Sequence, residues 1–166
     1  MIHCAIFKIR DCLKPRRRIL DSIKIERGFS VLDYGCGSGS YIIPLVEIVG
    51  NNGRVYACDV NPFAIQKIKS IILKKHITNV EIIHSACETG LLAESINVIL
   101  LYDVFHCLDN SNKILQELYR VLKRDGILSF RDHRMKRAEI ISNITNGKLF
   151  QLSDENSGTF NFAKVT

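Results

Sequence analysis

The sequence contains no tryptophan, only three prolines and only ten glycines among its 166 residues. So little glycine and proline excludes collagen-like and low-complexity chains, and a hydrophobic fraction of 46% excludes an intrinsically disordered one. A chain of this length is expected to fold as one domain with a substantial core. We therefore expect a single domain over 1–166, with an N-terminal helical extension over 1–28 and a core over 29–166.

Long apolar runs and paired cysteines are also missing. The longest apolar stretch near the N-terminus, 4–7, is far too short for a signal peptide or a membrane span. The sequence therefore predicts a cytoplasmic protein without a membrane partner. None of the six cysteines forms a Cys-x-x-Cys pair, which argues against a zinc ribbon or a thioredoxin-type site, and we expect no metal site.

The charge is moderately basic, with 23 Lys and Arg against 17 Asp and Glu, a formal net charge of +6. Much of the excess is spread along amphipathic segments, where it forms solvated faces. One local run, 131–137, follows a predicted strand and could attract an anionic substrate or an RNA backbone. A solvated helix start explains the same run equally well.

Short β-branched runs alternate along the chain with stretches that have helical spacing, the pattern of a parallel sheet with crossover helices. The predicted strands are 29–34, 54–58, 80–84, 96–102 and 127–131. The predicted helices are 16–26, 40–49, 61–72, 109–123 and 135–146. Two final strands, 148–153 and 159–165, are separated by only five residues, which predicts an antiparallel hairpin. The expected fold is an α/β, Rossmann-like, doubly wound sheet of seven strands, mostly parallel.

The first strand runs into a glycine-rich turn, VLDYGCGSG at 31–39. Glycines at such a turn let a ligand approach the backbone. The spacing differs from the dinucleotide pattern G-x-G-x-x-G, and Asp33 would place a negative charge beside a pyrophosphate. Asp33 instead suits a ligand with an ammonium group, while Asp59 at the end of the second strand suits ribose hydroxyls. An adenosine that carries a cationic amino acid satisfies these features together.

These segments resemble the class I S-adenosylmethionine-dependent methyltransferases. The sequence at 31–39 looks like the first motif of the family, and VYACDVNP at 55–62 looks like the second. Residues 97–106 resemble the family's fourth strand and the loop after it, and 115–130 resemble the following helix and fifth strand. The likeness runs from about residue 28 to the C-terminus, including the final hairpin.

The resemblance implies a cofactor site for S-adenosyl-L-methionine. Asp33 would hold the methionine ammonium group, and the backbone of Gly35, Cys36 and Gly37 would line the methionine portion. Asp59 would bind both ribose hydroxyls. Val60 would pack on the adenine. The family often has an aspartate after the third strand, but Ala86 stands there in this sequence, so adenine recognition would depend on backbone groups near Ala86 and Cys87.

Methyl transfer from a sulfonium centre needs mainly an aligned nucleophile, so no catalytic acid or base is obligatory. The best candidates follow the fourth strand. Tyr102 would form a hydrogen bond at the methyl pocket or line its wall, and His106 would take a proton from an oxygen or nitrogen nucleophile. The competing interpretation is that Tyr102 packs in the sheet edge and that His106 caps a loop.

Four cysteines, Cys36, Cys58, Cys87 and Cys107, also fall at or just after the carboxyl ends of strands. They could together hold a thiophilic substrate or ion, or they could simply be small side chains that fit a crowded rim.

The sequence favours a methyltransferase for a small-molecule acceptor. The alternatives are an RNA or protein methyltransferase that uses the basic run, and a noncatalytic S-adenosylmethionine-binding subunit, since few residues outside the core remain to form a substrate lid. A nucleotide-sugar or nicotinamide enzyme is a more distant alternative. The sequence names neither the methyl acceptor nor the oligomeric state.

Overall fold

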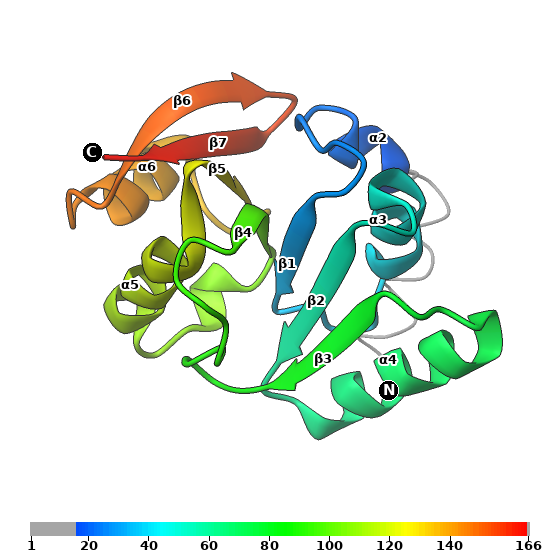
Figure 1. The fold of residues 1–166 in the computed structure, drawn as a ribbon. Helices are drawn as coiled ribbons and strands as arrows, with labels where there is room; N and C mark the ends of the chain where they lie inside the picture. Colours follow the sequence, from blue (N-terminus) through cyan, green and yellow to red (C-terminus); the bar gives the residue numbers. More distant parts are fainter. Residues whose placement is uncertain (1–15, 166) are drawn as a thin grey trace.

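One seven-stranded sheet, in the order β3-β2-β1-β4-β5-β7-β6, forms the centre of the protein (Figure 1). The computed structural model describes residues 16–165, so predictions for 1–15 and 166 lie outside the described residues. The strands are β1 (Ser30–Tyr34), β2 (Arg54–Asp59), β3 (Val80–His84), β4 (Ile96–Tyr102), β5 (Leu122–Arg131), β6 (Phe150–Asn156) and β7 (Thr159–Lys164). The first five strands run parallel, and β7 is antiparallel to both β5 and β6. The predicted fold class is confirmed.

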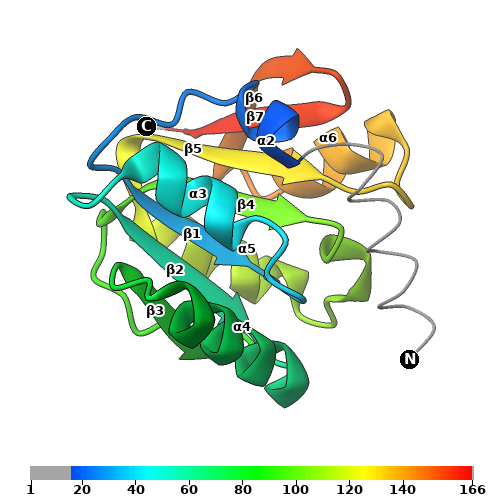
Figure 2. The same ribbon diagram turned by 90° about the vertical axis from the view of Figure 1, so that its right-hand side faces the viewer.

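Helices cover both faces of this sheet (Figure 2). They are α2 (Arg16–Leu20), α3 (Ile42–Val49), α4 (Pro62–Lys75), the 3₁₀ helix η1 (Phe105–Cys107), α5 (Ser111–Val121) and α6 (Arg137–Thr145). Strand side chains alternate between the two faces, so Val31 packs with α2, α3 and α4, whereas Leu32 packs with α5 and α6. Each face therefore has its own apolar core.

Two strands, β3 and β4, have the predicted bounds, and the start of α4 is also as expected. The side chain of Asn61 accepts a hydrogen bond from the Phe63 amide at 2.9 Å, and Pro62 occupies the first helical position. These boundaries depend on local chemistry, which is why the sequence alone indicates them.

Three predicted boundaries are wrong. The helix predicted over 16–26 ends at Leu20, and the Ser22 hydroxyl then donates to the Ile19 carbonyl at 2.7 Å. β5 begins at Leu122 rather than 127, because the expected turn is an irregularity inside the strand: Ile96 pairs with Leu122, and Val98 already pairs with Ile127. The final hairpin turns at Ser157 and Gly158 alone, both with positive φ.

None of the helices among residues 16–165 has the length and apolar character needed to cross a membrane.

Candidate functional site

The carboxyl ends of β1 and β4 mark the point where the sheet changes winding direction. β1 and β4 are neighbours, and the chain leaves β1 towards α3 on one face and leaves β4 towards α5 on the other. Loops at such a point diverge and leave room for a ligand at the strand ends. Every site residue predicted from the sequence lies at or just after the carboxyl end of β1, β2, β3 or β4.

The three glycines after β1 all have positive φ, but only one faces open space. A Cβ on Gly35 would come within 2.6 Å of Val104, and a Cβ on Gly39 within 2.4 Å of Ile68, so those two glycines permit close packing. For Gly37, at φ +50°, the nearest atom to an added Cβ would be a backbone oxygen 3.9 Å away. Gly37 therefore leaves an unfilled approach to the backbone, which fits the expected methionine portion of the cofactor.

Asp59 ties the glycine turn to β2. Its Oδ2 accepts the Gly37 amide at 2.8 Å, and its Oδ1 accepts the Asn61 amide at 2.8 Å. Each carboxylate oxygen has a further lone pair, so the group can still accept hydrogen bonds from ribose hydroxyls. The next residue, Val60, has a 62% exposed side chain, an apolar surface suited to an adenine ring.

Asp33 is a buried carboxyl group with an unsatisfied oxygen. The residue is 2% exposed, and its Oδ2 has no hydrogen-bond partner in the described part of the chain. Burial raises the pKa of Asp33 to about 7, the charge of Asp59 also acts to raise it, and the Arg16 guanidinium acts in the opposite direction. A buried carboxylate of this kind gains most from a cationic partner, so it fits the ammonium group of the expected cofactor.

In the segment after β3, the backbone groups expected to bind adenine already form hydrogen bonds within the chain. The Ala86 carbonyl accepts the Tyr34 hydroxyl at 2.9 Å, and the Cys87 amide donates to the Ser85 hydroxyl at 3.2 Å. The Ala86 carbonyl retains a second lone pair for the adenine amino group. The predicted roles of Ala86 and Cys87 in cofactor binding stay predictions.

Tyr102 is buried inside the sheet. Its hydroxyl lies 2.8 Å from the Ser129 hydroxyl, and its ring meets the edge of Tyr41 at 5.2 Å between centroids. Burial raises the pKa of Tyr102, so its hydroxyl keeps its proton at neutral pH. This position favours a structural or wall role over proton transfer.

Within residues 16–165, the four cysteines at the strand ends do not form a thiol cluster. Cys36 and Cys58 are buried, and burial raises the pKa of both thiols, to about 12 for Cys58. Within residues 16–165, no three cysteines come close enough to hold one ion. The interpretation of these residues as small side chains at a crowded rim is therefore favoured.

His106 lies in η1 and contacts an aspartate that follows β5. Its Nδ1 is 2.7 Å from Asp132 Oδ2, and its backbone amide donates to the same oxygen at 3.3 Å. The Asp132 side chain is fully buried, and its Oδ1 accepts the Arg134 amide at 3.0 Å. An ionised carboxylate only accepts hydrogen bonds, so Nδ1 donates in this contact, and in a neutral imidazole Nε2 is then the proton acceptor.

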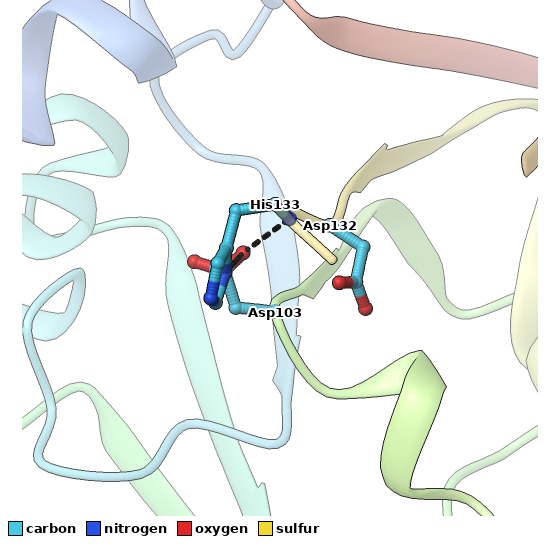
Figure 3. A group of neighbouring side chains, drawn as sticks. All are labelled: Asp103, Asp132 and His133. Atoms are coloured by element: carbon cyan, nitrogen blue, oxygen red, sulfur yellow. Dashed lines mark hydrogen bonds and ion pairs between the residues drawn. The ribbon is translucent and has the colours of Figure 1, made fainter. Parts of the chain in front are cut away.

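In a second histidine–aspartate pair, the aspartate follows β4 and the histidine follows β5. Asp103, directly after β4, accepts both the backbone amide and the Nδ1 of His133, which follows β5 (Figure 3). These distances are 3.0 and 2.7 Å. Ligand atoms of Asp103, Asp132 and His133 lie within 4.8 Å of one another. In the structure, the carboxylates accept hydrogen bonds from imidazole and amide groups.

Sequence reasoning missed Asp132, His133 and the role of Asp103. Only their positions could have indicated these residues. Because β4 and β5 are parallel neighbours, the residues that follow the two strands lie at the same edge of the sheet. The two contacts join residues 26 and 30 positions apart, and the sequence contains no motif that pairs them.

The residues of the basic run 131–137 differ in their contacts. Arg131 donates to the Ser157 carbonyl at 3.0 Å and so anchors the hairpin. Arg137 pairs with Glu155 at 2.8 Å. Arg134 and Lys136 are exposed. The run is therefore partly structural, and a role in binding an anionic substrate or RNA stays a prediction.

Comparison with known proteins agrees with the predicted family and fold. Residues 25–161 match a family model described as a methyltransferase domain. The fold is similar to the crystal structure of a SAM-dependent methyltransferase from Aquifex aeolicus, with 25% sequence identity and a TM-score of 0.79 over 96% of this chain and 97% of that one.

The matches to two curated relatives cover a smaller share of each relative's length. Mouse arsenite methyltransferase is 31% identical over 113 residues, which is 61% of this chain and 30% of that protein. A demethylmenaquinone methyltransferase from Geobacillus stearothermophilus is 25% identical over 124 residues, 74% of this chain and 53% of that protein. The chain thus spans about half, or less, of these relatives.

Proposed function

The chain belongs to the S-adenosylmethionine-dependent methyltransferases, and from this premise we propose that it transfers a methyl group to a small-molecule acceptor. The observations that support the cofactor part of the proposal are the buried Oδ2 of Asp33, which has no partner within residues 16–165, and the open approach at Gly37. A ligand with a cationic group for Asp33 and a narrow portion that fits against the backbone of Gly37 would satisfy both features. In the proposed complex, Asp59 binds the ribose and Val60 supports the adenine.

When bound, the cofactor supplies an electrophilic methyl group, and its sulfur keeps the electron pair of the broken carbon–sulfur bond. The cofactor residues Asp33 and Asp59 lie at the ends of β1 and β2, so the ends of β4 and β5 are left for the acceptor. There His106 receives at Nε2 the proton that the acceptor oxygen or nitrogen loses as it bonds to the methyl group. Asp132 holds the ring in the required tautomer and stabilises the imidazolium that forms.

Replacing His106 with glutamine tests this role. His106→Gln removes the proton acceptor from the β4–β5 end but changes no proposed cofactor contact. We expect S-adenosylmethionine affinity within about twofold of wild type and turnover of a small-molecule acceptor panel slower by about 100-fold. Calorimetry and transfer of a labelled methyl group measure the two quantities.

His76→Asn is the matched control, because His76 ends α4 at the opposite edge of the sheet and asparagine tolerates its left-handed backbone. Unchanged turnover in His106→Gln would contradict the role of His106 as base. Cofactor binding without turnover of any acceptor, by wild type, would favour the noncatalytic subunit. Salt-sensitive retention on RNA that is lost when Arg134 and Lys136 are neutralised would favour an RNA methyltransferase.

A further inference from the structure

The Asp103–His133 pair has a geometry that the proposed proton transfer to His106 does not use. Asp103 has a positive φ of 53°, a conformation uncommon for residues other than glycine, and its amide donates to the Arg131 carbonyl at 2.7 Å. This contact fixes the residue between the ends of β4 and β5. Its carboxylate accepts two hydrogen bonds from His133, one from the backbone amide and one from Nδ1.

The two imidazole–carboxylate pairs are crossed. The aspartate after β4 holds the histidine after β5, and the aspartate after β5 holds the histidine in η1, which follows β4. The two rings lie 6.1 Å apart between centroids, at an angle of 78°. Two imidazoles are therefore held next to each other, in fixed orientations, at the end of the sheet assigned to the acceptor.

Both rings use the same nitrogen for their aspartate. With Nδ1 occupied in each, Nε2 is the remaining polar atom, and neither Nε2 has a hydrogen-bond partner within residues 16–165. The side chains are exposed by 17% for His106 and 50% for His133, so ligands can reach both. His84 differs, because its Nε2 lies 2.9 Å from the Val60 carbonyl.

We propose that His133, positioned by Asp103, is a second acceptor-binding imidazole, and that the acceptor therefore carries a second proton-donating group besides the one that is methylated. His106 Nε2 takes the proton of the methylated group, and His133 Nε2 accepts a hydrogen bond from the other. The chemical class is a small molecule with two hydroxyl or amine groups. This inference rests on the proposed function, because it assigns the β4–β5 end to the acceptor.

Histidine side-chain ¹⁵N NMR of the full chain, with the demethylated cofactor present, tests the arrangement without an acceptor. We expect His106 and His133 to be Nδ1–H tautomers. Asp103→Gly keeps the positive φ but removes the carboxylate, and it should shift His133 alone towards a mixture of tautomers. Asp103→Asn keeps an acceptor oxygen and should restore the Nδ1–H form. An Nε2–H form of His133 in the wild type would overturn the inference.

Binding of small phenols tests the acceptor class. The probes are phenol, catechol, resorcinol and hydroquinone, measured by the same histidine signals. At least one dihydroxybenzene should bind about tenfold more tightly than phenol, the gain expected from one additional hydrogen bond. The preference should disappear in His133→Phe and persist in His76→Asn. Equal affinities, no binding of any probe, or a preference that survives in His133→Phe would each overturn the inference.

Two further outcomes separate the possible failures. Tight binding of Mn²⁺ that broadens the His133 signal and is lost in Asp103→Asn would identify a cation site instead, and would overturn the inference. Failure to bind S-adenosylmethionine, with the tautomers as expected, would contradict the proposed function itself. The expected cofactor binding together with no preference among the phenols would contradict only the inference about His133.

Discussion

The two halves of the carboxyl edge satisfy their polar groups in opposite ways. At the ends of β1 and β2, which we propose as the cofactor half, Asp33 has an oxygen without a partner among residues 16–165, and Gly37 leaves a space that no described atom fills. At the ends of β4 and β5, which we propose as the acceptor half, both aspartates are bonded to histidines within the chain. The carboxylate of the first half still lacks a partner, whereas the carboxylates of the second are already paired and only the ring Nε2 atoms stay open.

This difference indicates how each half recognises its ligand. A buried carboxylate without a partner gains a large interaction only from one kind of ligand, so we expect the proposed cofactor half to select a cation. The acceptor half presents two oriented ring nitrogens, which many small molecules with proton-donating groups can use. Cofactor binding should therefore be sensitive to single changes, and acceptor choice should depend on how the two imidazoles are oriented.

The largest expected effect is that of Asp59→Ala. The substitution removes the acceptor for the Gly37 and Asn61 amides and the proposed ribose contacts. Losing two hydrogen bonds to a charged group predicts S-adenosylmethionine affinity at least about 100-fold lower by calorimetry. Asp125→Ala, an exposed change outside the carboxyl edge, is the control. Affinity within about threefold of wild type in Asp59→Ala would contradict the assignment of the ribose site.

Gly37→Ala should have the next largest effect. The new Cβ meets no described atom within 3.9 Å but enters the space assigned to the methionine portion. Gly28→Ala is matched, because Gly28 also has positive φ and open surroundings. Each variant should lose about 1 kcal/mol of unfolding free energy. Only Gly37→Ala should weaken cofactor binding, by roughly 30-fold, or about 2 kcal/mol. Equal binding by the two variants would show that the open space is not the cofactor site.

The smallest expected effect is a pH dependence at Asp33. Burial raises its pKa to about 7, so near that pH the free protein holds a proton that an ammonium ligand must displace. Cofactor affinity should fall by up to about tenfold per pH unit below the pKa of Asp33. Calorimetry between about pH 6 and 8 should show this slope in wild type and none in Asp33→Asn, which should bind weakly at every pH.

The same raised pKa affects stability with a defined sign. The folded protein binds the Asp33 proton more tightly than the unfolded chain does, so this group's contribution to unfolding free energy falls as the pH rises from about 4 to about 7. Denaturant titrations of wild type and Asp33→Asn over that range compare the contribution directly. An identical pH dependence of the two proteins would contradict the burial of an unpartnered carboxyl group.

The positions of the proposed cofactor residues could be predicted from the sequence because the patterns that place them are local. The glycine turn, Asp33 and Asp59 each lie at the end of a strand with a recognisable pattern, and Asn61 caps the next helix as expected. The start of β5 was not predictable in this way. Asp125 and Gly126 have the residue types of a turn, but pairing of Leu122 with Ile96 extends the strand past them.

The acceptor half is the part that required the structure. The position of His106 after β4 indicates a candidate base, but Asp132 and His133 lie within a run of basic residues that suggests surface charge. Their roles depend on hydrogen bonds between distant positions, brought together by parallel pairing of β4 and β5. No local sequence pattern encodes such contacts.

The most direct test of the central claim is a calorimetric titration of the full chain with S-adenosylmethionine, its demethylated product and NAD. S-adenosylmethionine and its demethylated product should bind with one-to-one stoichiometry, and binding of both should be lost in Asp59→Ala. Tight binding of NAD with no response to S-adenosylmethionine would contradict the claim.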